Sequence, residues 1–127
     1  MKRQIVATDA APKAVGPYSQ AVWAGDVLFC AGQIPLDPAT GNMVAGGIAE
    51  QAARVLENIR GVLKSQGLDF GNVVKSTVFL SDMNNFGAMN EVYARYFTKD
   101  PPARSTVQVA RLPKDALVEI EVVAARC

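Results

Sequence analysis

The sequence predicts an α+β fold in which one mixed β-sheet carries two helices on a single face. Three observations lead to this prediction. Apolar or alternating runs of strand length recur along the chain, two longer segments show helical periodicity between them, and turn-forming residues separate the runs. A chain of 127 residues is long enough to bury a core without disulfides or metal, so we expect one domain over residues 1–127.

The N-terminal third predicts three strands followed by a loop. The first strand covers about residues 2–8, and the next two cover about 19–23 and 27–32, with a turn at Ala-Gly-Asp between them. Residues 36–47, LDPATGNMVAGG, are rich in Pro, Gly, Asp and Asn and indicate a loop.

A first helix is predicted from about Ile48 to Gln66. Its apolar residues recur at steps of three and four, which places them on one stripe: Ile48, Ala52, Val55, Ile59 and Val62. Gly67 stands where a helix commonly ends in the left-handed conformation.

The second half predicts a strand at about 72–81, a helix over 83–97, and strands over 103–111 and 116–125. Asp82 and Asn84 are both candidate caps of this second helix. Its apolar side is predicted to comprise Phe86, Met89, Tyr93 and Tyr96.

The two faces of the predicted sheet differ in character. In the last strand one face is wholly apolar and suits burial under the helices: Val118, Ile120, Val122 and Ala124. In the strand at 72–81 the corresponding face is predicted to comprise Val74, Ser76, Val78 and Leu80. The opposite sheet face mixes apolar with ionisable residues, among them Lys75, Phe79, Glu119 and Glu121. That face either meets water or lines a subunit interface.

The composition limits the classes of function. Half of the residues are hydrophobic and 20% are charged, which is apolar for a small monomer and favours an oligomer. The net charge of +1 is dispersed, so we expect no nucleic-acid partner. No apolar run has the length of a membrane span or a signal peptide. Cys30 and Cys127 suggest no disulfide framework, so we expect a reducing, cytoplasmic location.

The absence of histidine from the sequence excludes several kinds of active site. Ser-His-Asp and Cys-His nucleophile systems need an imidazole. Zinc and non-haem iron sites usually need imidazole or clustered thiolates, so we expect no metal site. Catalysis in this chain must use Arg, Lys, Tyr, acidic or hydroxyl side chains, Cys, backbone amides or water.

Five segments together resemble the RidA/YjgF family of reactive intermediate deaminases: GPYSQAV at 16–22, AGQIPLDPATG at 31–41, NVVKSTVFLSDMNNFGAMNEVYARYF at 72–97, PPARSTVQVARLPKD at 101–115 and VEIEVVA at 118–124. The resemblance implies a chorismate-mutase-like α+β fold and a homotrimer with three clefts between subunits. It implies hydrolysis of 2-aminoacrylate, 2-iminopropanoate and 2-iminobutanoate to 2-oxo acids and ammonia, which protects pyridoxal-phosphate enzymes. It implies no cofactor.

The same resemblance implies roles for three catalytic residues. Arg104 would bind the substrate carboxylate through two parallel hydrogen bonds, Tyr18 would line the cleft, and Glu119 would lie near the reacting carbon and water. Taken alone, each has a plainer interpretation: Arg104 as a strand-end cation paired with Glu119 or Glu121, Tyr18 as a packing residue, and Glu119 as part of a solvated strand face.

Three further residues are implied to contact substrate: Ala31, Gly32 and Thr106. Two of them depart from the usual pattern of the family. Many members have serine where this chain has Ala31, and many have cysteine where it has Thr106. An essential serine hydroxyl or a nucleophilic cysteine at these positions is therefore not expected. Cys30, in an apolar strand, is interpreted as a packed small side chain.

Three other functions compete with the deaminase. A trimeric protein could bind 2-oxo or amino acids through Arg104 without converting them, and a structural or chaperone trimer would not depend on Arg104 at all. A ribonuclease or translation inhibitor is disfavoured because the chain has neither histidine nor a basic stripe.

Overall fold

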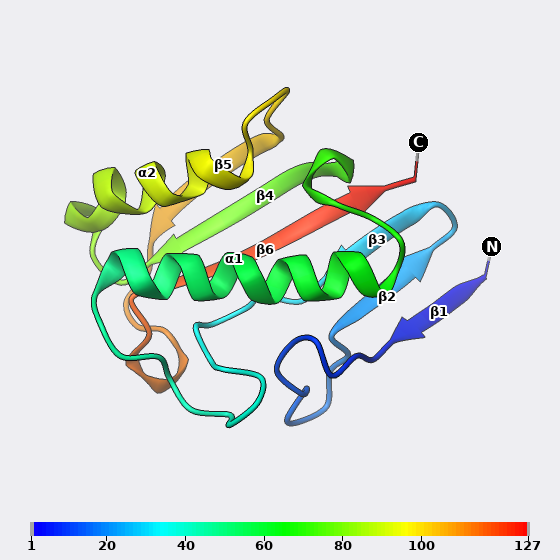
Figure 1. Cartoon of the computed structure of the whole chain (residues 1–127), viewed down its shortest axis with the longest axis horizontal. Coiled ribbons are helices and arrows are strands. Elements are labelled where there is room, and N and C mark those ends of the chain that lie inside the picture. Colours follow the sequence, from blue (N-terminus) through cyan, green and yellow to red (C-terminus); the bar gives the residue numbers. More distant parts are fainter. Residues whose placement is uncertain (1, 127) are drawn as a thin grey trace.

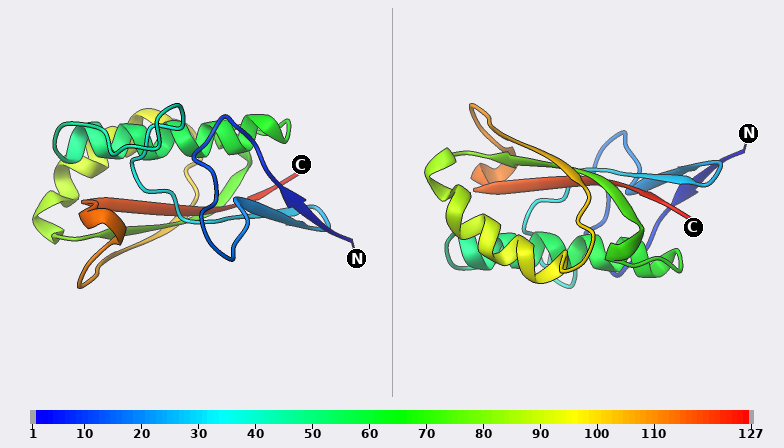
Figure 2. Two further views of the ribbon diagram at one scale, coloured as in Figure 1. Left: turned by 90° about the horizontal axis from the view of Figure 1, so that it is seen from below. Right: turned by 90° about the horizontal axis from the view of Figure 1, so that it is seen from above.

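The computed structural model describes residues 2–126, which form one six-stranded sheet with two helices on one side. The strand order is β1-β2-β3-β6-β4-β5, and only the β4–β5 pair is parallel. The strands are β1 (Arg3–Val6), β2 (Ala21–Ala24), β3 (Val27–Cys30), β4 (Val73–Leu80), β5 (Ala103–Gln108) and β6 (Val118–Ala125). The helices α1 (Ile48–Ser65) and α2 (Phe86–Tyr96) both cover the same sheet face (Figures 1 and 2), as predicted.

Helix α1 follows its predicted apolar stripe. Ala52, Val55, Ile59 and Val62 are all buried against the sheet. The helix begins after Gly47, whose backbone N–H donates to the Glu50 carboxylate at 2.8 Å. It ends one residue earlier than predicted, at Ser65, and Gly67 follows with φ of +73°, the left-handed conformation that glycine adopts most easily.

Helix α2 starts later than predicted. Residues 83–85 form a short 3₁₀ turn, in which the Asp82 carboxylate accepts a hydrogen bond from the Asn84 backbone at 2.9 Å. Met89 and Tyr93 are buried as expected. Phe86 instead is partly exposed, and the Arg104 guanidinium lies over its ring.

The core lies between the helices and one face of the sheet. The predicted face of β6 is fully buried, with Val118, Ile120, Val122 and Ala124 at 1% exposure or less. In β4 the prediction that Val74 joins this face is wrong. A β-bulge between the Val73 and Lys75 pairs turns Val74 outward, and Val73 is buried in its place.

The first strand ends two residues earlier than predicted, at Val6, the second begins two residues later, at Ala21, and the Gln20 side chain binds the loop between them. Its side-chain amide accepts from the Thr8 backbone N–H at 2.6 Å and donates to the carbonyl oxygens of Thr8 and Pro12 at 3.0 and 2.7 Å. Gln20 is 4% exposed, and backbone groups of this loop satisfy its side-chain amide. Gln20 thereby fixes the loop over residues 8–18 against the start of β2.

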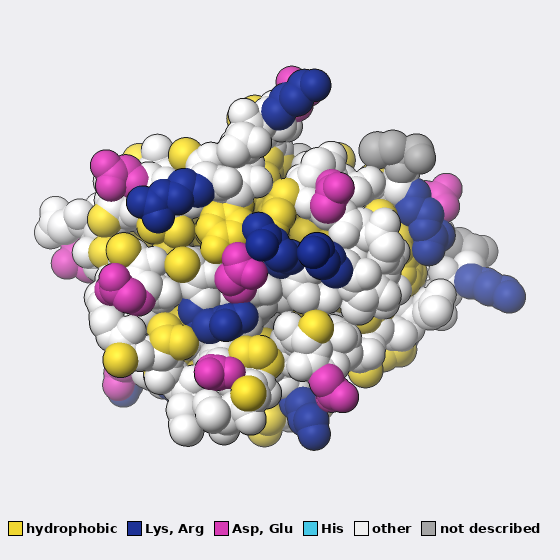
Figure 3. Space-filling model, viewed as in Figure 1, with side chains coloured by type: hydrophobic (Ala, Val, Ile, Leu, Met, Phe, Trp, Pro, Cys, Tyr) yellow, Lys and Arg dark blue, Asp and Glu magenta, His cyan; other side chains and the backbone are white. Residues whose placement is uncertain are grey.

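Neither α1 nor α2 covers the opposite face of the sheet, here called the helix-free face (Figure 2). Ile5, Phe29 and Val107 lie on it and are each 42–53% exposed. Lys75 and Glu119 lie on the same face, so it has the mixed character that the sequence predicts. Over the helix side, cationic and anionic side chains are interspersed (Figure 3). None of the helices within residues 2–126 combines the length and the apolar character needed to cross a membrane.

Candidate functional site

Four of the predicted site residues line one cavity of about 590 Å³: Tyr18, Ala31, Gly32 and Glu119. The loop before β2 supplies the tyrosine, the segment after β3 supplies Ala31 and Gly32, and the start of β6 supplies the carboxylate. Ile34 and Leu36 add apolar wall, while Lys13 and Lys114 stand at exposed positions of the lining. Segments distant in the sequence therefore meet at this cavity.

Gly32 and Glu119 are in such close contact that any side chain at position 32 would have to displace the Glu119 carboxylate. A methyl group on Gly32 would collide with the Glu119 carboxylate, with the added carbon 2.9 Å from Cδ. The residues that follow in sequence hold Gly32 beside Glu119, because Gln33 and Ile120 exchange backbone hydrogen bonds of 2.9 and 3.2 Å. Gly32 thus leaves room for a carboxylate that β6 directs into the cavity.

Glu119 is the only carboxylic acid among the described residues that line this cavity. Burial raises its pKa above the ordinary value for glutamate, and the nearby charge of Glu121 raises the pKa further. None of the ion pairs among residues 2–126 involves Glu119. A half-buried carboxyl without an ion-pair partner retains its proton to higher pH than a solvated one, so it is suited to proton transfer.

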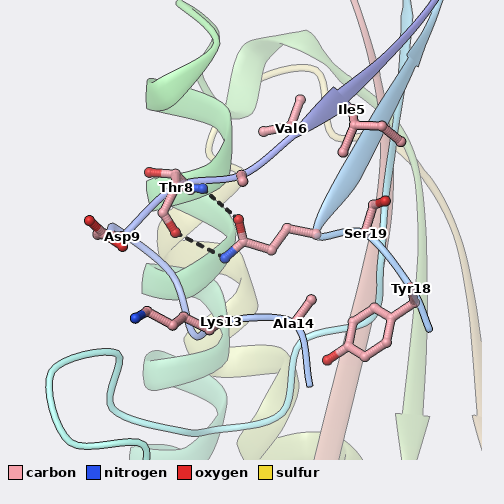
Figure 4. Close-up of a pocket in the computed structure, with 10 residues that line it drawn as sticks. Ile5, Val6, Thr8, Asp9, Lys13, Ala14, Tyr18 and Ser19 are labelled. Atoms are coloured by element: carbon pink, nitrogen blue, oxygen red, sulfur yellow. Dashed lines mark hydrogen bonds between the residues drawn. The ribbon is translucent and has the colours of Figure 1, made fainter. Parts of the chain in front are cut away.

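Tyr18 stands at the boundary of two cavities. It lines the cavity that contains Glu119, and it lines a second cavity of about 410 Å³ beside β1 (Figure 4). Gly16, with φ of +116°, makes the turn in which the Tyr18 backbone N–H donates to the Gly16 carbonyl at 2.9 Å. Tyr18 is 54% exposed in the chain, so its side chain is accessible from these cavities.

Arg104 lies elsewhere, on the edge strand β5. Its Nη1 donates to Asn90 Oδ1 at 2.8 Å, and its guanidinium lies 4.7 Å from the centre of the Tyr93 ring and 5.5 Å from that of Phe86. Together with Pro101 and other residues it lines a cavity of about 400 Å³. The plainer interpretation, a pair with Glu119 or Glu121, is wrong, since no ion pair among residues 2–126 includes Arg104.

One chain does not bring all six predicted residues together. Arg104 pairs with Ser76, whose side chain is buried under the helices, whereas Glu119 pairs with Phe79 on the helix-free face. Thr106 follows Arg104 on β5 and pairs with the buried Val78. Arg104 and Thr106 are therefore separated from the Tyr18–Glu119 cavity by strand β4 and by the thickness of the sheet.

The sequence analysis did not identify Asn90 or Gln20 as functional residues. Gln20 gives no sequence signal, because its four partners are backbone groups of a loop. A signal for Asn90 existed: Phe86, Asn90 and Tyr93 follow at steps of four and three, which places a polar side chain on an otherwise aromatic helix face.

Two other ionisable residues behave as structural groups. Burial raises the pKa of the Cys30 thiol to about 12, which keeps it protonated and supports its interpretation as a packed side chain. The Lys75 ammonium donates a hydrogen bond of 3.1 Å to the hydroxyl of Ser105 on the neighbouring strand β5. Neither group adds a nucleophile to the candidate site.

Among proteins of known family, a family model described as Endoribonuclease L-PSP matches residues 8–126. A RutC family protein of Pyrococcus horikoshii is 54% identical over 122 residues, covering 96% of this chain and 97% of its own. The 2-iminobutanoate/2-iminopropanoate deaminase of Homo sapiens is 49% identical over 122 residues, covering 96% of this chain and 89% of its own.

Solved structures give the same relationship. A putative endoribonuclease of Thermotoga maritima superimposes with a TM-score of 0.96 at 51% identity, covering 100% of this chain and 99% of that one. Escherichia coli TdcF, crystallised with bound serine, has a TM-score of 0.93 at 45% identity, covering 98% and 99%. With the sheet order, the two helices and the matched residues all in agreement, this chain belongs to the RidA/YjgF family.

Proposed function

We propose that this protein is a hydrolytic deaminase of reactive enamine and imine acids. The substrates are 2-aminoacrylate, 2-iminopropanoate and 2-iminobutanoate, and the products are 2-oxo acids and ammonia. The observation that carries the proposal is Glu119: a half-buried carboxyl with a raised pKa, without an ion-pair partner, in a cavity that it shares with Tyr18. The human relative that bears this activity in its name is 49% identical.

The residues of the cavity suit this chemistry because the substrate is already electrophilic. An enamine acid gains a proton at C3 to become the imine, and water then adds to C2 to give a carbinolamine. Transfer of a proton to nitrogen releases ammonia and leaves the 2-oxo acid. Glu119 orients the water and relays the protons, and the Tyr18 hydroxyl holds the water or the amine. No strong nucleophile is required, which agrees with a chain that has no histidine.

Arg104 supplies the binding of the substrate carboxylate in this proposal. Its planar guanidinium can donate two parallel hydrogen bonds to a carboxylate, and no acidic residue within 2–126 forms an ion pair with it. Since one chain separates Arg104 from Glu119, a second copy of the chain must complete the site. Arg104 and Thr106 of one subunit would face Tyr18, Gly32 and Glu119 of the next.

The completed assembly is proposed to be a homotrimer with one such cleft between each pair of subunits. The apolar side chains exposed on the helix-free sheet face, Ile5, Phe29 and Val107, support burial of this face between copies. Light scattering after size exclusion should give three times the 13.5 kDa of one chain. A monomer at micromolar concentration would remove the shared site.

A coupled assay tests the activity directly. Serine or threonine dehydratase generates the imine, and its loss and the release of 2-oxo acid are followed with and without this protein. We expect faster loss of the imine, and no effect of chelators after dialysis. Restoration of a chelator-treated sample by a divalent metal would contradict the cofactor-free mechanism.

A second candidate, a trimeric binding protein for amino or 2-oxo acids, is favoured by one observation. The related TdcF structure contains bound serine. If imine decay is unchanged by the protein while serine or 2-oxobutanoate binds, the binding function replaces the deaminase. The description of the family model suggests cleavage of RNA. This function is disfavoured because the chain has no histidine, and because acidic side chains lie among the basic ones on the helix side, so that no continuous basic patch forms there (Figure 3).

A further inference from the structure

Asn90 contacts the one cation that the proposed function requires. Its half-buried amide oxygen Oδ1 accepts a hydrogen bond of 2.8 Å from Arg104 Nη1. It lies on α2 between Phe86 and Tyr93, and the guanidinium lies over both of their rings. The spacing of four and three residues places all three side chains on one helix face, opposite the start of β5.

The base of this arrangement is buried and hydrogen-bonded. Tyr93 is 5% exposed, and its hydroxyl is hydrogen-bonded at 2.6 Å to the hydroxyl of Ser76, which is 1% exposed. Ser76 is also the strand partner of Arg104 in the β4–β5 register. The aromatic ring below the guanidinium is therefore fixed by the same strand pair that carries the arginine, so the ring limits where Arg104 can move.

The chemical nature of the partner matters as much as its position. An amide oxygen occupies one of the five N–H donors of Arg104 and brings no charge. A carboxylate at the same place would form an ion pair and satisfy the guanidinium within the chain. The aromatic faces likewise attract the cation without neutralising it. Arg104 is thus held in place while its charge and its other donors remain for a ligand.

From this geometry we infer that Asn90 is a positioning residue, which orients Arg104 as a receptor for the carboxylate of the ligand while leaving its charge uncompensated. The inference rests on the proposed function, in which Arg104 binds the substrate carboxylate. The inference goes beyond the role of Arg104, because it requires that residue 90 accept a hydrogen bond and that it be neutral.

Two substitutions separate the two parts of this requirement. Asn90→Ala removes the acceptor and keeps the charge of Arg104 available. Asn90→Asp is nearly isosteric, keeps an acceptor, and neutralises the guanidinium. Asn42→Asp, the same change at an exposed loop position, is the matched control. Oligomeric mass and melting temperature are recorded for each, and the Asn90→Asp variant alone decides the inference if Asn90→Ala does not fold.

Binding of 2-oxobutanoate by calorimetry and steady-state kinetics on dehydratase-generated imine are the first readouts. We expect Asn90→Ala to weaken binding about fivefold to tenfold, the effect of one hydrogen bond. Asn90→Asp should weaken it roughly 30-fold or more, because the charge that meets the carboxylate is lost, and should raise KM more than it lowers kcat. A residue that only stabilised the fold would not produce this order.

The second readout is independent of turnover. In the nitrogen NMR spectrum of the arginine side chains, slow rotation of the Arg104 guanidinium should be seen in the wild type and in Asn90→Asp, and should be lost in Asn90→Ala. Unchanged rotation in Asn90→Ala, or wild-type affinity for 2-oxobutanoate in Asn90→Asp, would overturn the inference.

The same experiment distinguishes failure of the proposed function. If the wild type binds 2-oxobutanoate but does not accelerate imine loss, the deaminase proposal fails while Asn90 is still judged by binding and rotation. If the wild type does not bind 2-oxobutanoate at all, Arg104 is no carboxylate receptor and the inference about Asn90 fails with it.

Discussion

The two halves of the proposed site treat their charged groups in opposite ways. Glu119 is enclosed in a cavity against Gly32, and burial makes its charged form less favourable. Arg104 is enclosed by two aromatic rings and a neutral amide, which hold the cation without an opposing charge. The first environment favours movement of a proton, and the second favours attraction of an anion. Proton transfer is therefore assigned to Glu119 and recognition of the ligand to Arg104, and each half of the site can be tested alone.

Removal of the acid should have the largest effect. Glu119→Gln keeps the shape of the side chain and removes its ability to transfer a proton, which is commonly worth roughly 10²–10⁴-fold in rate. The loss of rate is measured as the change in turnover number with dehydratase-generated imine. Glu121→Gln, on the same strand face but more exposed, is the control and should lower the rate far less. Equal, small effects of both substitutions would assign Glu119 a structural role.

Removal of the Arg104 cation should cause the second-largest loss of activity. Loss of one partner of a buried charge pair typically costs about 2–5 kcal/mol, or roughly 30- to several-thousand-fold. We therefore expect Arg104→Ala to lose most activity while remaining a trimer. Arg104→Lys should also fail substantially, because an ammonium cannot form the same pair of parallel bonds. Turnover and oligomeric mass are measured together.

The ligand can be varied in place of the arginine. The wild type should bind 2-oxobutanoate and should not bind its amide, which offers no negative charge. Near-normal turnover by Arg104→Ala would exclude the proposed carboxylate site, and loss of the trimer in that variant would favour a structural role for the arginine.

Gly32→Ala should have an intermediate effect. The added methyl group would displace the Glu119 carboxylate, so we expect the rate to fall by about tenfold, as for a displaced general acid. Gly87→Ala is the matched control, since it lies in α2 with nothing within 4 Å of the added carbon and should be neutral or slightly stabilising. A fully active Gly32→Ala protein would show that the close approach of Gly32 to Glu119 has no role in catalysis.

The smallest effect concerns stability and pH. The pKa of Glu119 is raised in the folded protein, so its protonated form favours folding, and this contribution is lost as the pH rises through the folded pKa. Glu119→Gln should therefore be more stable than the wild type at pH 8, by less than about 1 kcal/mol because solvent screens a half-exposed carboxyl. Denaturant midpoints at pH 4 and pH 8 test this, and the difference should shrink at the lower pH. A larger gain at pH 4 would contradict the assigned direction.

Much of the fold is encoded locally. The stripe of α1, the capping glycine after it and the buried face of β6 each follow from the spacing of residues within one element, and the structure confirms them. Val74 shows where spacing fails, because a bulge adds one residue to the strand and reverses the direction of its side chain. Nothing in the alternation of residues 72–81 indicates that interruption.

What the sequence by itself determined was the set of elements, the difference between the two sheet faces, the exclusion of imidazole chemistry and, through the family motifs, the identity of the candidate residues. The tertiary structure alone decided which of them meet. Strand order places β4 between Glu119 and Arg104, and the two side chains emerge on opposite faces. The Asn90–Arg104 bond also joins a helix to a strand 14 residues later. Such relations depend on contacts between elements, which no periodicity within one element can specify.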